Sequence, residues 1–362
     1  MRSRKTALIL ALVSSVAACS GEDGSVSSSG STGSSSGNTE PPDTTSSSSS
    51  TSSSSSSSGQ PGDAGPDAPT GAPDPTAKGP FAITEIDRSA KVTATNDTVP
   101  LHIAVPTGAG PFPVLVFAHG FRIPSSQYYG TVRWLASFGY VALTADYPAG
   151  FTDVSNVRDS QNLSGALDWV LSASELTGKV DTKKAGVLGH SRGGKAAVLA
   201  ASKDARFGAV LGLDPVDVKP PLPCNETTEC PDSRDALAGM SIPSAMLGST
   251  VDGTGGFGGA CAPPAGNFTT FFAKAKSPAY SVTITGSSHM SFVEDAPTCG
   301  FACGACNPAT AKLDDVLSLS RAYSVAFFER HLKGNAAYAT YLDGAQSKAL
   351  WVTPGRAQIS SK

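Results

Sequence analysis

Short, continuous apolar runs that alternate with longer amphipathic stretches limit most strongly how this chain can fold. Runs without polar alternation indicate strands buried on both faces, as in a parallel sheet. Strands that alternate with helices predict βαβ units, and so an α/β fold with a mostly parallel sheet and helices on both faces. Residues 81–86 and 101–105 alternate like half-buried strands. The further expected strands are 113–118, 140–145, 185–189, 208–213, 242–247 and 280–285, and the expected helices are 125–138, 157–172, 191–203 and 313–332.

A serine follows the expected strand 185–189 and opens the expected helix 191–203, within Gly189-His190-Ser191-Arg192-Gly193. A serine at a sharp strand-to-helix turn needs small neighbours two positions before and after it, because the backbone there is crowded. Glycine stands at both positions. This pattern in this context is typical of the nucleophile elbow of α/β-hydrolases, and it predicts Ser191 as a catalytic nucleophile.

A nucleophile of this kind needs hydrogen-bond donors for the oxyanion that forms during reaction. In the α/β-hydrolase architecture they come from the residue after the nucleophile and from the loop after the third strand. The expected strand 113–118 runs into His119-Gly120-Phe121. We therefore predict that the backbone N–H groups of Phe121 and Arg192 form the oxyanion hole, and that His119 has a structural role.

The general base should be a histidine late in the chain, because this architecture places serine, acid and histidine in that order. Of the five histidines, His289 lies just after the last expected strand, where its loop would reach the edge of the sheet that carries Ser191. Two aspartates could orient its imidazole. Asp214 follows one expected strand and Asp252 follows the next, and spacing alone leaves both open.

The motifs around these residues resemble the chlorophyllase group of α/β-hydrolases over residues 113–332. The same core is similar to platelet-activating-factor acetylhydrolases and to bacterial polyester hydrolases. Likeness to the first two groups implies Asp214 as the acid, and likeness to the third implies Asp252; the closer likeness around Asp214 favours Asp214. The matching segments are Phe117-Ala-His-Gly-Phe121, Gly189-His-Ser-Arg-Gly-Gly-Lys195, Gly212-Leu-Asp-Pro-Val-Asp217, Cys261 to Phe272 and Gly286-Ser-Ser-His-Met-Ser-Phe292.

The N-terminal residues are typical of an export signal. Basic residues precede a short apolar run, and Val16-Ala-Ala-Cys19 resembles a bacterial lipobox, with Cys19 as the lipidated residue. An ordinary signal peptide is the alternative. We predict a lipoprotein signal over 1–18, a disordered tether rich in Ser, Gly and Pro over 19–80, and a catalytic domain over 81–362. The expected location is the bacterial cell envelope, anchored by lipid at the outer membrane or cell surface.

Charge and cysteine content limit the partners. The chain has 27 Lys and Arg against 30 Asp and Glu, so it has no basic excess to favour a nucleic-acid partner. Export predicts up to three disulfides among the six cysteines after Cys19, with Cys224 and Cys230 close enough in sequence to pair. Zinc binding by the clustered cysteines is the alternative. The six are Cys224, Cys230, Cys261, Cys299, Cys303 and Cys306.

These observations predict a secreted, lipid-anchored serine hydrolase that cleaves small or polymeric carboxylic esters through an acyl-enzyme. No motif for a cofactor or a complete set of metal ligands is present in the sequence. A lipase or peptidase of the same fold is an alternative within the enzyme class. A cell-surface binding lipoprotein on a hydrolase scaffold that no longer catalyses is an alternative outside it, because fold does not fix function.

Overall fold

A computed structural model describes residues 72–148, 154–218, 224–254, 260–299 and 301–362 of the chain. The predicted signal peptide, Cys19 and nearly all of the predicted tether lie outside these residues. The last part of that predicted tether, 72–80, lies inside them and packs on the domain. The Tyr338 hydroxyl donates to the Pro73 carbonyl at 2.7 Å, and the Gly79 N–H donates to Ser137. The last residues of the predicted tether thus contact the domain that follows them.

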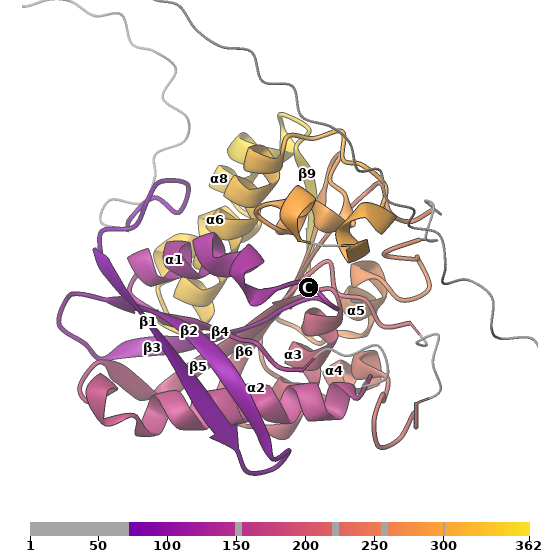
Figure 1. The fold of residues 1–362 in the computed structure, drawn as a ribbon. Helices are drawn as coiled ribbons and strands as arrows, with labels where there is room; N and C mark the ends of the chain where they lie inside the picture. Colours follow the sequence, from indigo (N-terminus) through magenta and orange to yellow (C-terminus); the bar gives the residue numbers. More distant parts are fainter. Residues whose placement is uncertain (1–71, 149–153, 219–223, 255–259, 300) are drawn as a thin grey trace, which may run out of the picture. The chain divides into compact units, whose positions relative to one another are not determined.

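Among the described residues, nine strands form one sheet at the centre of the fold, in the order β1-β2-β4-β3-β5-β6-β7-β8-β9. Figure 1 labels β1 to β6 and β9 of this sheet. The pairs from β4 through β3 and β5 to β8 are parallel, while β1, β2 and β9 are antiparallel to their neighbours. This arrangement confirms the predicted mostly parallel α/β fold. The strands are β1 (Ile83–Val92), β2 (Asp97–Pro106), β3 (Phe112–Ala118), β4 (Val141–Ala145), β5 (Val180–His190), β6 (Phe207–Leu213), β7 (Ser244–Gly248), β8 (Ala279–Ile284) and β9 (Ala357–Ser361).

Helices cover both faces of the sheet, as the apolar runs predict. Alternate residues of β3 show the two faces. Leu115 and Phe117 belong to the core that includes residues of α1 and α6, while Val114 and Val116 belong to the core that includes residues of α2 and α3. The α-helices are α1 (Tyr129–Ser137), α2 (Asn156–Ser172), α3 (Arg192–Lys203), α4 (Ser233–Gly239), α5 (Phe268–Lys274), α6 (Leu313–His331), α7 (Ala339–Leu342) and α8 (Ala345–Ser347).

Short single-turn helices fill several of the connections, and one of them carries the predicted catalytic histidine. The chain from the end of β8 enters η3 at His289, so this residue lies just beyond the carboxyl end of a parallel strand, as predicted. Within the described residues, no helix combines the length and the apolar character that a bilayer crossing requires. The short helices are η1 (Ser125–Tyr128), η2 (Ser174–Leu176), η3 (His289–Phe292), η4 (Ala296–Thr298), η5 (Phe301–Ala305), η6 (Ala336–Tyr338) and the π-helical η7 (Lys348–Val352).

An ion pair between the buried Asp97 and the partly exposed Arg158 joins the start of β2 to α2. Asp97 is 8% exposed and accepts hydrogen bonds from Arg158 Nε at 2.8 Å and from Asn162 Nδ2 at 2.8 Å. The Arg158 hydrogen bonds, helped by Asn162 and opposed by burial, lower the pKa of Asp97 to about 2. The folded state therefore favours the ionised carboxylate. The ionised Asp97 carboxylate stabilises the folded state in full above the ordinary aspartate pKa, and this contribution is lost as the pH falls through about 2.

Replacement of Asp97 by asparagine is expected to lower the free energy of unfolding at pH 7 by about 2 kcal/mol, because the native state holds the charged form. Urea denaturation at pH 7 and at pH 2 measures the difference between variant and wild type. That difference should shrink at pH 2. Asp168→Asn is the matched control, since Asp168 lies on α2 but is 65% exposed in its pair with Arg206. An equal loss in both variants would contradict the prediction.

Candidate active site

The turn between β5 and α3 holds Ser191 in a strained backbone conformation. Its φ of 57° lies in the left-handed region that side chains other than glycine rarely adopt. A Cβ on Gly189 would meet the carbonyl of Gly193, and a Cβ on Gly193 would meet the carbonyl of Ala118. Both glycines of the predicted elbow are therefore required by the close approach of backbone to backbone. The strain is consistent with a functional serine at this turn.

A chain of hydrogen bonds joins Ser191, His289 and Asp214. His289 Nε2 lies 2.8 Å from Ser191 Oγ, and His289 Nδ1 lies 2.7 Å from Asp214 Oδ2. Because a carboxylate only accepts, Nδ1 carries the proton, and the neutral ring then accepts the serine hydroxyl proton at Nε2. Asp214 is fully buried and His289 is 5% exposed, while Ser191 is partly exposed. The structure thus brings together three of the predicted site residues.

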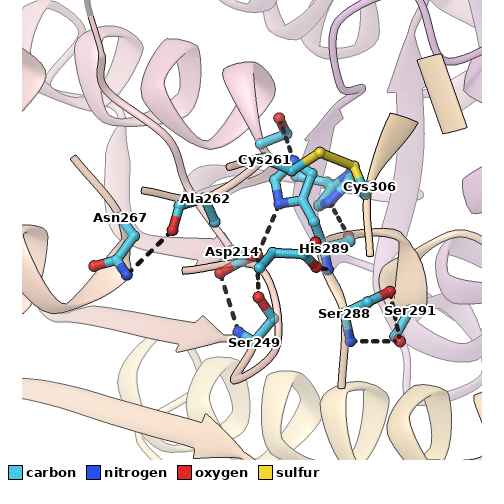
Figure 2. A network of polar contacts seen from close by, with 12 residues as sticks. Asp214, Ser249, Cys261, Ala262, Asn267, Ser288, His289, Ser291 and Cys306 are labelled. Carbon is cyan, nitrogen blue, oxygen red and sulfur yellow. Dashed lines mark hydrogen bonds and ion pairs between the residues drawn. A yellow bond between two sulfur atoms is a disulfide. The ribbon is translucent and has the colours of Figure 1, made fainter. Parts of the chain in front are cut away.

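Asp214 lies directly after β6 and is fixed by the residue that follows β7. The Ser249 hydroxyl donates to Asp214 Oδ2 at 2.8 Å, and the Ser249 N–H donates to Oδ1 at 3.1 Å. Figure 2 shows Asp214 between Ser249 and the imidazole of His289. Every contact in this group is a donor facing a carboxylate oxygen, which is the environment that an ionised aspartate prefers.

Asp252 contacts the main chain of His289, where Asp214 contacts its ring. One carboxylate oxygen of Asp252 accepts the backbone N–H of His289 in a short hydrogen bond, and the other accepts the backbone N–H of Asn307 at 2.9 Å. Asp252 is 1% exposed. Of the two aspartates that the sequence leaves open, Asp214 is therefore the one in position to orient the imidazole.

The predicted oxyanion loop lies against the start of α3. Arg192 is the first residue of α3, where backbone N–H groups point out of the helix. Its guanidinium lies 5.6 Å from the centre of the Phe121 ring and pairs with Asp159 at 2.7 Å. The close approach of Gly193 to the Ala118 carbonyl brings the end of β3 beside this helix start. Phe121 and Arg192 therefore lie on adjoining segments at the elbow.

His119 is 2% exposed and is held by backbone carbonyls. Its Nδ1 lies 2.8 Å from the Gly120 carbonyl, and its Nε2 lies 3.1 Å from the Tyr147 carbonyl. The Tyr147 hydroxyl donates back to the His119 carbonyl at 2.7 Å, and the two rings stack at 4.1 Å. Burial, only partly offset by the carbonyls, lowers the pKa of His119. These contacts agree with the structural role predicted for this histidine.

The six cysteines after Cys19 form three disulfides, which include the predicted pair Cys224–Cys230. Cys261–Cys306 joins two segments near His289, as Figure 2 shows, and Cys299–Cys303 closes a short turn. Among the described residues, one group of three could hold a metal ion, namely Asp252, Cys261 and Cys306. Its two sulfurs are bonded to each other, so this group does not offer thiolate ligands as it stands.

Three residues at the site escaped prediction. The Ser249 hydroxyl donates to Asp214. Tyr128 is hydrogen-bonded to His190, which in turn contacts the His289 carbonyl. Ser249 follows a predicted strand, which is the signal that could have drawn attention to it. His190 stands inside the elbow motif, but its neighbours depend on the fold. Tyr128 lies at the start of a predicted helix and carries no pattern of its own.

The sequence matches the model of the chlorophyllase family over residues 75–349, and that span holds all the site residues described above. The chain belongs to the chlorophyllase family. The span also covers most of the sheet and the helices on its two faces, so the family assignment rests on the whole folded unit. It confirms the likeness drawn from the five motifs.

Curated relatives agree with this family assignment. Chlorophyllase-1, chloroplastic, from Citrus sinensis is 28% identical over 206 residues, which cover 55% of this chain and 61% of that protein. Chlorophyllase-1 from Arabidopsis thaliana is 27% identical over 262 residues, which cover 66% of this chain and 78% of that protein. A bis(hydroxyethyl) terephthalate hydrolase from Streptomyces coelicolor is 30% identical over 159 residues, which cover 43% of this chain and 49% of that protein. The chain thus spans about three fifths of the citrus protein.

Proposed function

We propose that this protein is a serine hydrolase that cleaves carboxylic esters. The observation that carries the proposal is the unbroken hydrogen-bond chain from Ser191 through His289 to Asp214, with its two ends in opposite environments. The serine is partly exposed, where a substrate can reach it, and the aspartate is buried, where its charge is little screened. Membership of the chlorophyllase family supports the same chemistry.

In this mechanism Ser191 Oγ attacks the ester carbonyl while His289 Nε2 takes its proton. The imidazolium is stabilised by the Asp214 carboxylate beside Nδ1. His289 then gives the proton to the leaving alcohol, which leaves an acyl group on Ser191. Water, deprotonated by the same imidazole, attacks the acyl carbonyl and releases the acid.

The oxyanion of each tetrahedral intermediate is assigned to the backbone N–H groups of Phe121 and Arg192. Support comes from the position of Arg192 at the start of α3, next to Ser191, and from the packing of the β3 loop against that helix start. In comparable sites one such donor contributes about 3 kcal/mol to stabilisation of the transition state. Backbone donors need no reorganisation during the reaction, which suits this role.

The substrate is proposed to be a small or polymeric carboxylic ester. The names of the relatives supply two specific candidates, chlorophyll and bis(hydroxyethyl) terephthalate. Both are esters, so the shared chemistry is the acyl transfer described above. The chain is further proposed to be an exported lipoprotein with lipid on Cys19. Mass spectrometry of the N-terminal peptide from the native host tests this, and an unmodified or uncleaved Cys19 would overturn it.

The function is tested with the purified protein and a panel of esters. We expect hydrolysis of short p-nitrophenyl esters and of at least one of the two relatives' substrates. We also expect a fluorophosphonate probe to label the protein at Ser191, located by peptide mass spectrometry. A scaffold that only binds would neither hydrolyse any ester nor react with the probe. Cleavage of phospholipid or peptide bonds in place of these esters would indicate the lipase or peptidase alternative.

A further inference from the structure

Both backbone polar groups of His289 are held by buried side chains. Asp252 accepts its N–H, and His190 Nε2 lies 2.8 Å from its carbonyl oxygen. With Asp214 and Ser191 at the two ring nitrogens, all four polar atoms of His289 are hydrogen-bonded. The mechanism above uses only the two ring contacts. The main-chain contacts therefore need an explanation of their own.

The hydrogen bond at the His289 carbonyl is the end of a longer chain of hydrogen bonds, in which the donor and the acceptor of each bond can be assigned. A carbonyl oxygen only accepts, so His190 Nε2 carries a proton and donates a hydrogen bond to the His289 carbonyl oxygen. In a neutral ring Nδ1 must then accept, and the Tyr128 hydroxyl lies 2.8 Å from it. The oxygen of that hydroxyl in turn accepts the Gly120 N–H at 3.2 Å. Hydrogen bonds thus run from Gly120 through Tyr128 and His190 to His289.

The surroundings of this chain keep its protons in place. His190 and Tyr128 are fully buried. Burial, together with the neighbouring His289, holds the pKa of His190 well below its ordinary value, so the ring stays neutral. Burial raises the pKa of Tyr128 far enough that its hydroxyl remains a donor. The direction of the chain therefore persists across the pH range in which an imidazole base works.

The chain links the three segments that must keep register during the reaction. Gly120 directly precedes Phe121 in the oxyanion loop, His190 is the last residue of β5 and directly precedes Ser191, and His289 begins η3. The His190 and His289 rings lie 4.7 Å apart. A shift of about 1 Å in one of these segments can reduce turnover by about 100-fold.

We propose that Tyr128 and His190 are positioning residues that hold the catalytic His289 in register with Ser191 and the oxyanion loop. Neither side chain is required to touch the substrate. The proposal rests on the proposed function of Ser191 and His289. It assigns the histidine of the elbow motif a role through the backbone of His289, separate from any part in proton transfer.

The first test removes one oxygen atom. Tyr128→Phe should lower kcat by roughly tenfold with KM within about twofold of wild type, because a misplaced base slows chemistry more than binding. Tyr323→Phe is the matched control, since that buried hydroxyl donates to the Leu342 carbonyl elsewhere in the core. The control should keep wild-type kcat. Equal kcat in Tyr128→Phe and wild type would overturn the role of Tyr128.

The second test separates the hydrogen bond from the volume of the side chain. His190→Leu should lower kcat by roughly 100-fold. His190→Gln should recover much of this loss, because the glutamine amide nitrogen can occupy the place of Nε2 and donate to the His289 carbonyl. Thermal denaturation identifies any variant that does not fold. If the folded leucine and glutamine variants have the same kcat, His190 acts only through packing and the proposal is wrong.

A measurement that does not depend on turnover distinguishes failure of this inference from failure of the proposed function. In NMR spectra, the His289 Nδ1 proton that is hydrogen-bonded to Asp214 should exchange with solvent at least about tenfold faster in Tyr128→Phe than in Tyr323→Phe. The reason is that loss of the Tyr128 hydroxyl weakens the hydrogen bonds that hold the backbone of His289. Unchanged exchange would overturn the positioning role even if the enzyme is active. If exchange is faster in Tyr128→Phe but the wild-type protein hydrolyses no ester, the positioning role is upheld and the ester hydrolase function is rejected.

Discussion

Alanine at position 191 is expected to abolish hydrolysis of a short p-nitrophenyl ester while the protein still folds. The hydroxyl of Ser191 is the group that His289 Nε2 approaches, at 2.8 Å, and alanine leaves the imidazole with nothing to deprotonate but water. Loss of the nucleophile in comparable triads reduces kcat by about 10⁶-fold. Turnover should therefore fall to the background of the assay, and fluorophosphonate labelling should disappear.

The loss should come from chemistry, since Ser191 is partly exposed and its side chain adds little to the core. Relief of the left-handed backbone is not expected, because alanine at this position has the same φ penalty as serine. Ser324→Ala is the matched control. It removes a buried hydroxyl on α6 that donates to the Ser320 carbonyl, and it should keep wild-type kcat. Wild-type turnover in Ser191→Ala would remove Ser191 from the mechanism.

The central part of the fold follows from local pattern, and its edges do not. Strands buried on both faces are apolar, which makes β3 and the second half of β5 visible in the sequence. The first half of β5, residues 180–184, is mostly polar and not buried, and the apolar pattern does not predict it. The edge strand β9 reads Ala-Gln-Ile-Ser-Ser and is mostly exposed, so nothing in its composition distinguishes it from a loop. The short helices α4 and α5 were missed for a similar reason, since seven residues give too few turns for a clear period.

The site was predictable as far as chain order fixes it. The elbow motif predicts Ser191, because its glycines and its strand-to-helix turn are local features of the sequence. His289 is predicted by its position just after the last parallel strand. The choice between Asp214 and Asp252 was beyond spacing, because β6 and β7 are neighbours in the sheet and both carboxylates reach the same histidine. Which of them meets the ring and which meets the backbone depends on side-chain direction.

Asparagine at position 214 is expected to reduce kcat by about 10⁴-fold, as in comparable triads. Asp214 Oδ2 accepts from His289 Nδ1 and from the Ser249 hydroxyl, and Oδ1 accepts from the Ser249 N–H. Asparagine has one acceptor oxygen and one NH₂ group in place of the two carboxylate oxygens. Its NH₂ group must therefore face a donor, either the His289 Nδ1–H or the Ser249 N–H. With the NH₂ group toward His289, the ring proton moves to Nε2, where the ring no longer accepts from Ser191.

The matched variant is Asp252→Asn, which also loses one buried carboxylate charge beside His289. Asp252 contacts only backbone N–H groups in the hydrogen bonds described above, those of His289 and Asn307, so the ring keeps its tautomer. Some loosening of the histidine loop should lower kcat by roughly tenfold. Ester turnover of both variants, with folding checked by circular dichroism, decides between them. A larger loss in Asp252→Asn than in Asp214→Asn would transfer the acid role to Asp252, because only a residue that sets the state of the imidazole can have the greater effect.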